Sequence, residues 1–139
     1  MDISEEVYEL RGVFPHITRR DFYELDNGNT GVVVEYDTSG EFSRGTFEVL
    51  IEYTEGYPDT KPNAWVMEPN VDGSCGHIYN FDQNGHANIC YMGNRNWDPS
   101  YTSYDVAVMV KSWIFAYCRW EKTDNWGWNE AGLIDYLLE

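Results

Sequence analysis

The clearest pattern of hydrophobic and polar positions lies in residues 103–118 and predicts an amphipathic helix. Apolar side chains recur there every three or four residues, which places them on one face of a helix. They are Val106, Met109, Val110, Trp113, Ile114, Tyr117 and Cys118. Ser103 or Asp105 can cap the first turn. We expect the apolar face of this helix to pack on a sheet.

Four earlier segments have patterns typical of β-strands: residues 22–25, 31–36, 46–53 and 64–67. Alternation of apolar and polar side chains is most regular in residues 46–53, as in a half-buried strand. Turn-forming stretches such as Asp26-Asn27-Gly28-Asn29 separate the segments, so neighbouring strands are expected to run antiparallel. The pattern therefore predicts a four-stranded antiparallel meander.

Shorter apolar patterns lie at both ends of the chain. Ile3, Val7 and Leu10 predict an N-terminal helix, which Ser4 can cap and Gly12 ends. A second short C-terminal helix is predicted from Leu133, Ile134, Leu137 and Leu138. The expected fold is α+β, with helices on one face of an antiparallel sheet. We expect residues 1–139 to form a single domain, because this length supports one core and not two.

Residues 68–102 break these patterns and are rich in Gly, Pro and Asn, so they are expected to be mostly loop. A loop of this length inside a compact domain is usually functional. Its chemically active side chains are Cys75, His77, His86 and Cys90. The functional site is therefore expected in this segment.

Charge limits the kinds of partner. Lys and Arg number 9 against 24 Asp and Glu, a net charge of −15, so nucleic acid and acidic membrane surfaces are not expected partners. The acidity either keeps the chain soluble or attracts a basic protein partner. The acidic start of the sequence is unlike a signal peptide, and three cysteines suit a reducing compartment, so a cytoplasmic location is expected.

Cys90 is the leading candidate for a reactive residue. A cysteine reacts as its thiolate, which requires exposure and neighbours that favour the anion. Arg95, His77 and His86 are nearby in the sequence. The alternative is a small buried side chain, which is the usual role of a free cysteine. Cys118 is expected in the core, on the apolar face of the helix.

A structural zinc site is a further alternative. Cys75, His77, His86 and Cys90 supply two thiols and two imidazoles, the ligands that tetrahedral zinc accepts. The spacing of Cys75 and His77 does not match the usual pair of cysteines two residues apart. We therefore expect neither a metal nor a cofactor.

Short motifs follow one another in an order that resembles the ubiquitin-conjugating enzymes. Tyr57-Pro58 and Pro62 precede a predicted strand, Asn88-Ile89-Cys90-Tyr91 closes the loop, and Trp97-Asp98-Pro99 precedes the long helix. The family has a Tyr-Pro…Pro element, an Ile-Cys-Leu-type active-site segment and a Trp-Ser-Pro segment. Its Trp-x-Pro turn is expected to support the thiol loop.

The bacterial branch of the family, found in anti-phage cyclic-oligonucleotide signalling operons and bacterial ubiquitin-like operons, is the more similar one. The corresponding motifs here are His77-Ile78-Tyr79, Asn84-Gly85, Ile89-Cys90, Trp113 and Trp120-Glu121-Lys122-Thr123-Asp124-Asn125-Trp126. The resemblance covers residues 31–126 and implies a ubiquitin-conjugating-like fold with an N-terminal helix, a four-stranded meander, an active-site loop and C-terminal helices. Tyr79, Trp97 and Trp113 are expected to be packing residues.

The resemblance implies that Cys90 carries an acyl group as a thioester. The cargo would be the C-terminal glycine of a ubiquitin-like protein or of a cyclic-oligonucleotide synthase. An activating-enzyme-like protein would supply it and an amine would receive it. The resemblance implies anti-phage defence as the context. A binding module without catalysis is the alternative function.

The eukaryotic His-Pro-Asn triplet is absent, so no asparagine is assigned by motif to stabilise the oxyanion. Candidates for that task are backbone amides near Cys90, His77, Asn80 and Asn88. His77 is taken as the catalytic partner of Cys90, and a hairpin turning at Asn84-Gly85 would bring the two onto neighbouring strands. The alternative for His77 is a hydrogen-bonded structural histidine.

Overall fold

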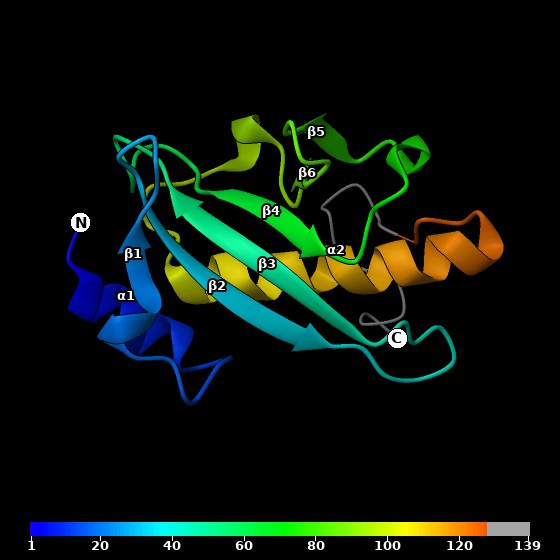
Figure 1. Ribbon diagram of the computed structural model, residues 1–139, viewed down its shortest axis with the longest axis horizontal. Coiled ribbons are helices and arrows are strands. Elements are labelled where there is room, and N and C mark those ends of the chain that lie inside the picture. Colours follow the sequence, from blue (N-terminus) through cyan, green and yellow to red (C-terminus); the bar gives the residue numbers. More distant parts are fainter. Residues whose placement is uncertain (128–139) are drawn as a thin grey trace.

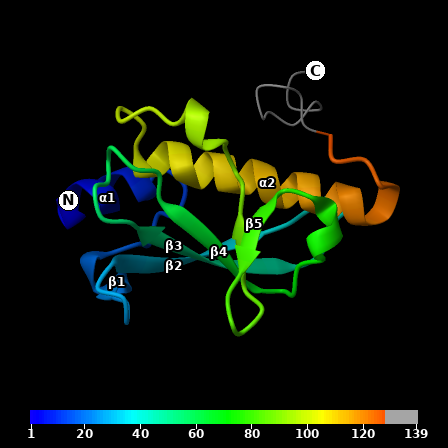
Figure 2. The same ribbon diagram turned by 90° about the horizontal axis from the view of Figure 1, so that it is seen from above.

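One antiparallel sheet of six strands and a long helix, α2 (Ser103–Thr123), form two layers (Figure 1). The computed structural model describes residues 1–127. In the view turned by 90°, α2 runs along one side of the sheet, and α1 (Ile3–Leu10) lies near its N-terminal end (Figure 2). The sheet order is β1-β2-β3-β4-β6-β5. Its strands are β1 (Phe22–Glu24), β2 (Thr30–Asp37), β3 (Thr46–Tyr53), β4 (Asn63–Glu68), β5 (Ile78–Phe81) and β6 (Ala87–Ile89).

The predicted four-stranded meander is present as β1 to β4, and the sheet continues beyond it. Strand β6 pairs with β4, where Trp65 lies opposite Asn88, and β5 pairs with β6, where Ile78 lies opposite Ile89. The segment expected to be mostly loop therefore contains a hairpin. Gly85 has a φ of 83° in its turn, a conformation that glycine adopts without steric cost. The hairpin predicted at Asn84-Gly85 is confirmed.

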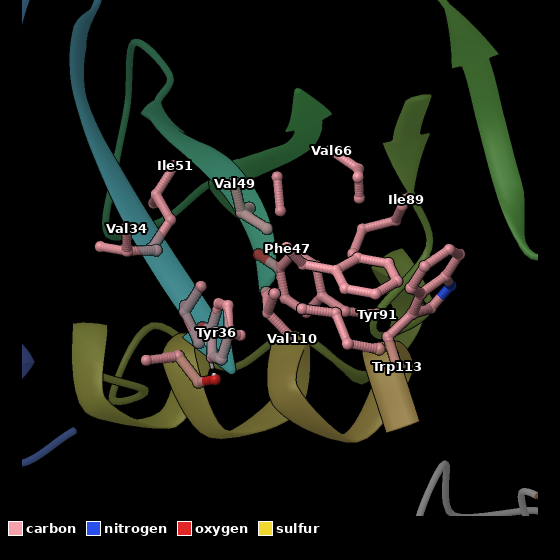
Figure 3. Close-up of a cluster of buried hydrophobic side chains, with 14 of the residues drawn as sticks. Val34, Tyr36, Phe47, Val49, Ile51, Val66, Ile89, Tyr91, Val110 and Trp113 are labelled. Carbon is pink, nitrogen blue, oxygen red and sulfur yellow. Dashed lines mark hydrogen bonds between the residues drawn. The ribbon is translucent and has the colours of Figure 1, made fainter. Parts of the chain in front are cut away.

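Alternating side chains from the sheet and one face of α2 make the core between the two layers (Figure 3). On β3, Phe47, Val49 and Ile51 are each fully buried. Trp113 and Val110 of α2 are also fully buried against them. The alternation along β3 and the spacing along α2 thus point the predicted apolar faces toward each other, as the sequence pattern indicates.

Side chains near the helix starts determine where the two helices begin. Asp2, and not Ser4, caps α1 by accepting a hydrogen bond from the Ser4 backbone N–H at 2.8 Å. The Thr102 side chain caps α2 by accepting a hydrogen bond from the Asp105 N–H. The Asp105 carboxylate accepts one from the Thr102 N–H, which completes a capping box. The helix predicted from Leu133 to Leu138 lies outside the described residues. Within residues 1–127, no helix is both long and apolar enough to cross a membrane.

Candidate active site

Cys90 directly follows β6, and a backbone hydrogen bond holds it in place. Its N–H donates to the carbonyl oxygen of His77 at 3.0 Å, which continues the pairing of β6 with the β5 side of the hairpin. The same carbonyl accepts the indole N–H of Trp113 at 3.0 Å. The expected proximity of His77 and Cys90 is therefore confirmed for their backbones, and α2 is tied directly to the strand pair that carries the thiol.

Burial separates Cys90 from the other two cysteines, all three of which lie within the described residues. Cys90 is partly exposed, whereas Cys75 and Cys118 are buried. Burial raises the pKa of the Cys75 thiol and raises that of Cys118 to about 11, so neither is suited to react as a thiolate near neutral pH. The placement of Cys118 in the core is confirmed.

Lys61 and Tyr79 lie against the segment that follows Cys90, although both precede it in the sequence. The Lys61 ammonium donates to the Tyr79 phenol oxygen at 2.6 Å and to the Met92 carbonyl at 2.5 Å. The Tyr79 hydroxyl also donates to the Met92 carbonyl, at 3.0 Å. The Lys61 Nζ lies over the rings of Tyr79 and Tyr91, 4.6 and 4.9 Å from their centroids. These contacts place a cation and a phenol against the segment that follows Cys90.

Cys90 affects the pKa of both side chains. Burial raises the pKa of Tyr79, and the nearby Cys90 raises it further. Burial lowers the pKa of Lys61, and the charge of Cys90 acts in the opposite direction. At neutral pH, Tyr79 is therefore a neutral hydrogen-bond donor in the surroundings of Cys90.

Two further contacts brace the thiol loop. The Tyr91 hydroxyl donates to the Pro62 carbonyl at 2.5 Å, in a buried position directly after Cys90. The indole N–H of Trp97 donates to the Pro58 carbonyl at 2.9 Å. The Trp97-Asp98-Pro99 turn is thus tied to the proline-containing loop before β4, as expected for a turn that supports the active-site segment.

The side chain of His77 packs on the side of α2. Its ring stacks on Trp126, with centroids 4.1 Å apart, and Trp126 packs edge-on against Trp113. Burial lowers the pKa of His77, so its imidazole is neutral at pH 7. The structure thus gives His77 a clear backbone contact with Cys90 and an aromatic setting for its ring.

The asparagines expected near the oxyanion are engaged with each other, since Asn88 Nδ2 donates to Asn80 Oδ1 at 3.2 Å. Asn88 also lines a cavity of about 460 Å³. That cavity shares Lys61 and Tyr79 with the surroundings of the thiol, and Asn63 and Trp97 form part of its wall. A volume of this size accommodates several residues of an extended chain or a small ligand.

The four residues considered as zinc ligands do not form a metal site. Within the described part of the chain, no three His, Cys, Asp or Glu side chains come together that could hold a metal ion. Cys75 is buried, and His86 Nδ1 pairs with Asp82 Oδ2 at 2.7 Å in the hairpin turn. The zinc-stabilised alternative therefore has no support in this geometry.

Sequence reasoning missed Lys61 as a site residue and assigned Tyr79 to packing. Tyr79 is 44% exposed, so the packing assignment is wrong, whereas Trp113 is fully buried, as expected. The sequence carried one signal for Tyr79, namely its place in the His77-Ile78-Tyr79 motif. Lys61 gave no comparable signal, because only the pairing of β4 with β6 brings it to the thiol.

The fold consists of a helix, an antiparallel meander, a hairpin that ends in a partly exposed cysteine, and a second helix. This is the fold of the ubiquitin-conjugating-like class. Comparison with family models narrows this class. The model described as Type II CBASS E2 protein matches residues 10–132, and the chain belongs to this family of bacterial, ubiquitin-conjugating-like proteins of anti-phage defence. No curated protein and no solved structure matched the chain. The resemblance stated from the sequence is confirmed.

Proposed function

We propose that the protein carries an acyl group as a thioester on Cys90 and transfers it to an amine during anti-phage defence. The observation that carries the proposal is the partial exposure of Cys90 beside Lys61 and Tyr79, in contrast to two buried cysteines. The cargo is the C-terminal glycine of a ubiquitin-like protein or a nucleotide cyclase. An activating-enzyme-like protein delivers it, and the free thiol is suited to the reducing cytoplasm.

The transfer consists of two exchanges at one carbonyl carbon. In the first, the Cys90 thiolate attacks the thioester on the activating protein, the carbonyl electron pair moves onto oxygen, and collapse of the oxyanion expels the donor thiolate. In the second, a neutral amine attacks the Cys90 thioester, and the Cys90 thiolate leaves. The amine nitrogen then loses a proton to solvent, which leaves an amide. No oxidant or reductant is needed.

His77 has two parts in this proposal. Its carbonyl oxygen holds the Cys90 N–H and fixes the direction in which the thiol leaves β6. Its neutral imidazole is the proposed side-chain partner for the amine step, as the resemblance implies. Replacement of His77 by Gln keeps the backbone contact and removes the imidazole, so it separates these parts. If the imidazole takes part, transfer to an amine slows while formation of the thioester is preserved.

The experiment that tests the function combines the purified protein with the activating protein and the candidate cargoes encoded beside it. We expect an adduct on non-reducing electrophoresis that disappears with added thiol and in Cys90→Ala. Cys75→Ala is the matched control and should retain the adduct. Absence of an adduct with every neighbouring cargo contradicts the proposal. Full phage protection by Cys90→Ser would instead indicate a binding module.

A further inference from the structure

We propose that Tyr79, positioned by Lys61, donates the hydrogen bond that stabilises the oxyanion formed at the Cys90 thioester. The inference rests on the proposed function and adds the group that its sequence motifs left unassigned. Tyr79 is the proposed catalytic residue, because its hydroxyl would contact the reacting carbonyl. Lys61 is a positioning residue that acts through Tyr79.

The first argument is the position of the phenol oxygen. It accepts a hydrogen bond from Lys61 Nζ at 2.6 Å, just before β4. It donates one to the Met92 carbonyl at 3.0 Å, in the segment after Cys90. These two contacts hold the phenol against the segment that directly follows Cys90. In a thioester the carbonyl oxygen is only two bonds from the sulfur, so a donor that reaches the sulfur is also close to the developing oxyanion.

The second argument is that the phenol can change partner at little cost. Its proton points to the Met92 carbonyl in this structure, and that carbonyl also accepts a bond from Lys61. When Tyr79 turns its hydroxyl to an oxyanion, Lys61 keeps the Met92 carbonyl satisfied. The Met92 carbonyl therefore keeps a hydrogen-bond donor when Tyr79 turns away.

The positive charge of Lys61 also supports this role of Tyr79. In a chain with a net charge of −15, the Lys61 ammonium is a cation placed next to the site where negative charge develops. A cation that donates to a phenol oxygen makes the phenol a stronger donor. The phenol itself stays neutral at pH 7, because burial and Cys90 both raise its pKa.

The other candidates are less well placed. The ring of His77 stacks on Trp126, and the amide nitrogen of Asn88 donates to Asn80. The contacts of Lys61 and Tyr79, in contrast, converge on the residues that follow Cys90. Tyr79 is therefore added to the candidates named from the sequence, which are backbone amides near Cys90, His77, Asn80 and Asn88.

A model reaction tests the pair without the activating protein. A short peptide ending in glycine, supplied as its 2-mercaptoethanesulfonate thioester, acylates Cys90 through an oxyanion. Iodoacetamide alkylates the same sulfur without one. We expect Tyr79→Phe to slow acylation by about 10- to 100-fold, the scale of one lost oxyanion donor, and to change alkylation by less than about threefold. Lys61→Met should act in the same direction, and Lys61→Arg should restore most of the rate.

Two substitutions away from the thiol are matched controls: Tyr23→Phe on β1 and Lys111→Met on α2 should leave both rates unchanged. Equal slowing of acylation and alkylation in Tyr79→Phe, or no slowing of acylation, overturns the inference. Tyr79 is 44% exposed, so loss of a single hydroxyl should leave the fold intact, which circular dichroism checks. If model acylation depends on Tyr79 but no cargo forms an adduct, the inference stands and the proposed function fails.

Discussion

At Glu52, on β3, four side chains donate to one buried carboxylate. Asn27 and Asn29 from the β1–β2 turn bind Oε2, at 2.6 and 2.9 Å, and Asn63 and Trp65 of β4 bind Oε1, at 3.1 and 3.0 Å. Burial by itself raises the pKa of Glu52, but these four hydrogen bonds outweigh it and lower the pKa from 4.5. The charged carboxylate therefore links the turn to the middle of the sheet.

Glu52→Gln should lower the free energy of unfolding at pH 7 by about 1–3 kcal/mol, because hydrogen bonds to a charged acceptor are lost. The folded-state pKa is lowered, so the contribution of Glu52 is complete above its unfolded pKa near 4.5 and is lost as the pH falls through the folded value. Urea titrations at several pH values measure this. Glu48→Gln, on the same strand and face, is the control; a gap between wild type and Glu52→Gln that is constant with pH would refute the assignment.

Of the residues at the candidate site, Cys90 could be predicted from the sequence and Lys61 could not. Cys90 could be selected because an ordered series of motifs surrounds it. Lys61 could not, since an isolated lysine before a strand gives no pattern of its own. Its role depends on the pairing of β4 with β6, a contact between segments distant in the sequence. Such contacts are the part of a site that one sequence does not encode locally.

At the level of elements, strands were predictable where one face is buried over a sufficient length. Residues 46–53 alternate regularly, and β3 has the same bounds, Thr46–Tyr53. The short strands Ile78–Phe81 and Ala87–Ile89 were not recognised within the long loop. Strand β5 has largely exposed side chains, and β6 is buried throughout, so neither alternates. The Asn84-Gly85 turn was their only local signal.

Helix α2 supports the hairpin through Trp113, which leads to a prediction at this scale. Trp113→Phe removes the bond to the His77 carbonyl and leaves a space in a fully buried position. We expect a loss of about 2–4 kcal/mol in the free energy of unfolding. We also expect faster hydrogen exchange at the Cys90 amide, because that amide shares the His77 carbonyl. Trp120→Phe, on the same helix but only partly buried, is the control; equal effects of the two would contradict this role of Trp113.

At the scale of the whole molecule, four acidic side chains lie together around a cavity at α1. A cavity of about 560 Å³ at α1 is lined by Asp2, Glu5, Glu6 and Glu9, and by aromatic and proline side chains of the loops before β4 and α2. A basic protein surface would be attracted to it. This location gives the basic-partner interpretation of the sequence a testable form.

We expect the association rate with the activating partner to fall as salt rises from 0.01 to 1 M, because the Debye length shortens from about 30 to about 3 Å. The double variant Glu5→Lys, Glu9→Lys should reduce the rate at low salt by at least about tenfold. Glu24→Lys, Glu35→Lys makes the same change in net charge on β1 and β2 and is the control. Association that is indifferent to salt would favour the simpler view that acidity only maintains solubility.

The proposed function requires an acyl group bonded to Cys90, and mass spectrometry detects that group on the peptide that contains Cys90. The protein is incubated with the activating protein and cargo, digested with pepsin at acidic pH, and analysed by mass spectrometry. The account predicts that the peptide containing Cys90 gains the C-terminal residues of the cargo, less one water, and that hydroxylamine removes them. A cargo fragment on a lysine or on Cys75, with Cys90 unmodified throughout the reaction, would contradict it.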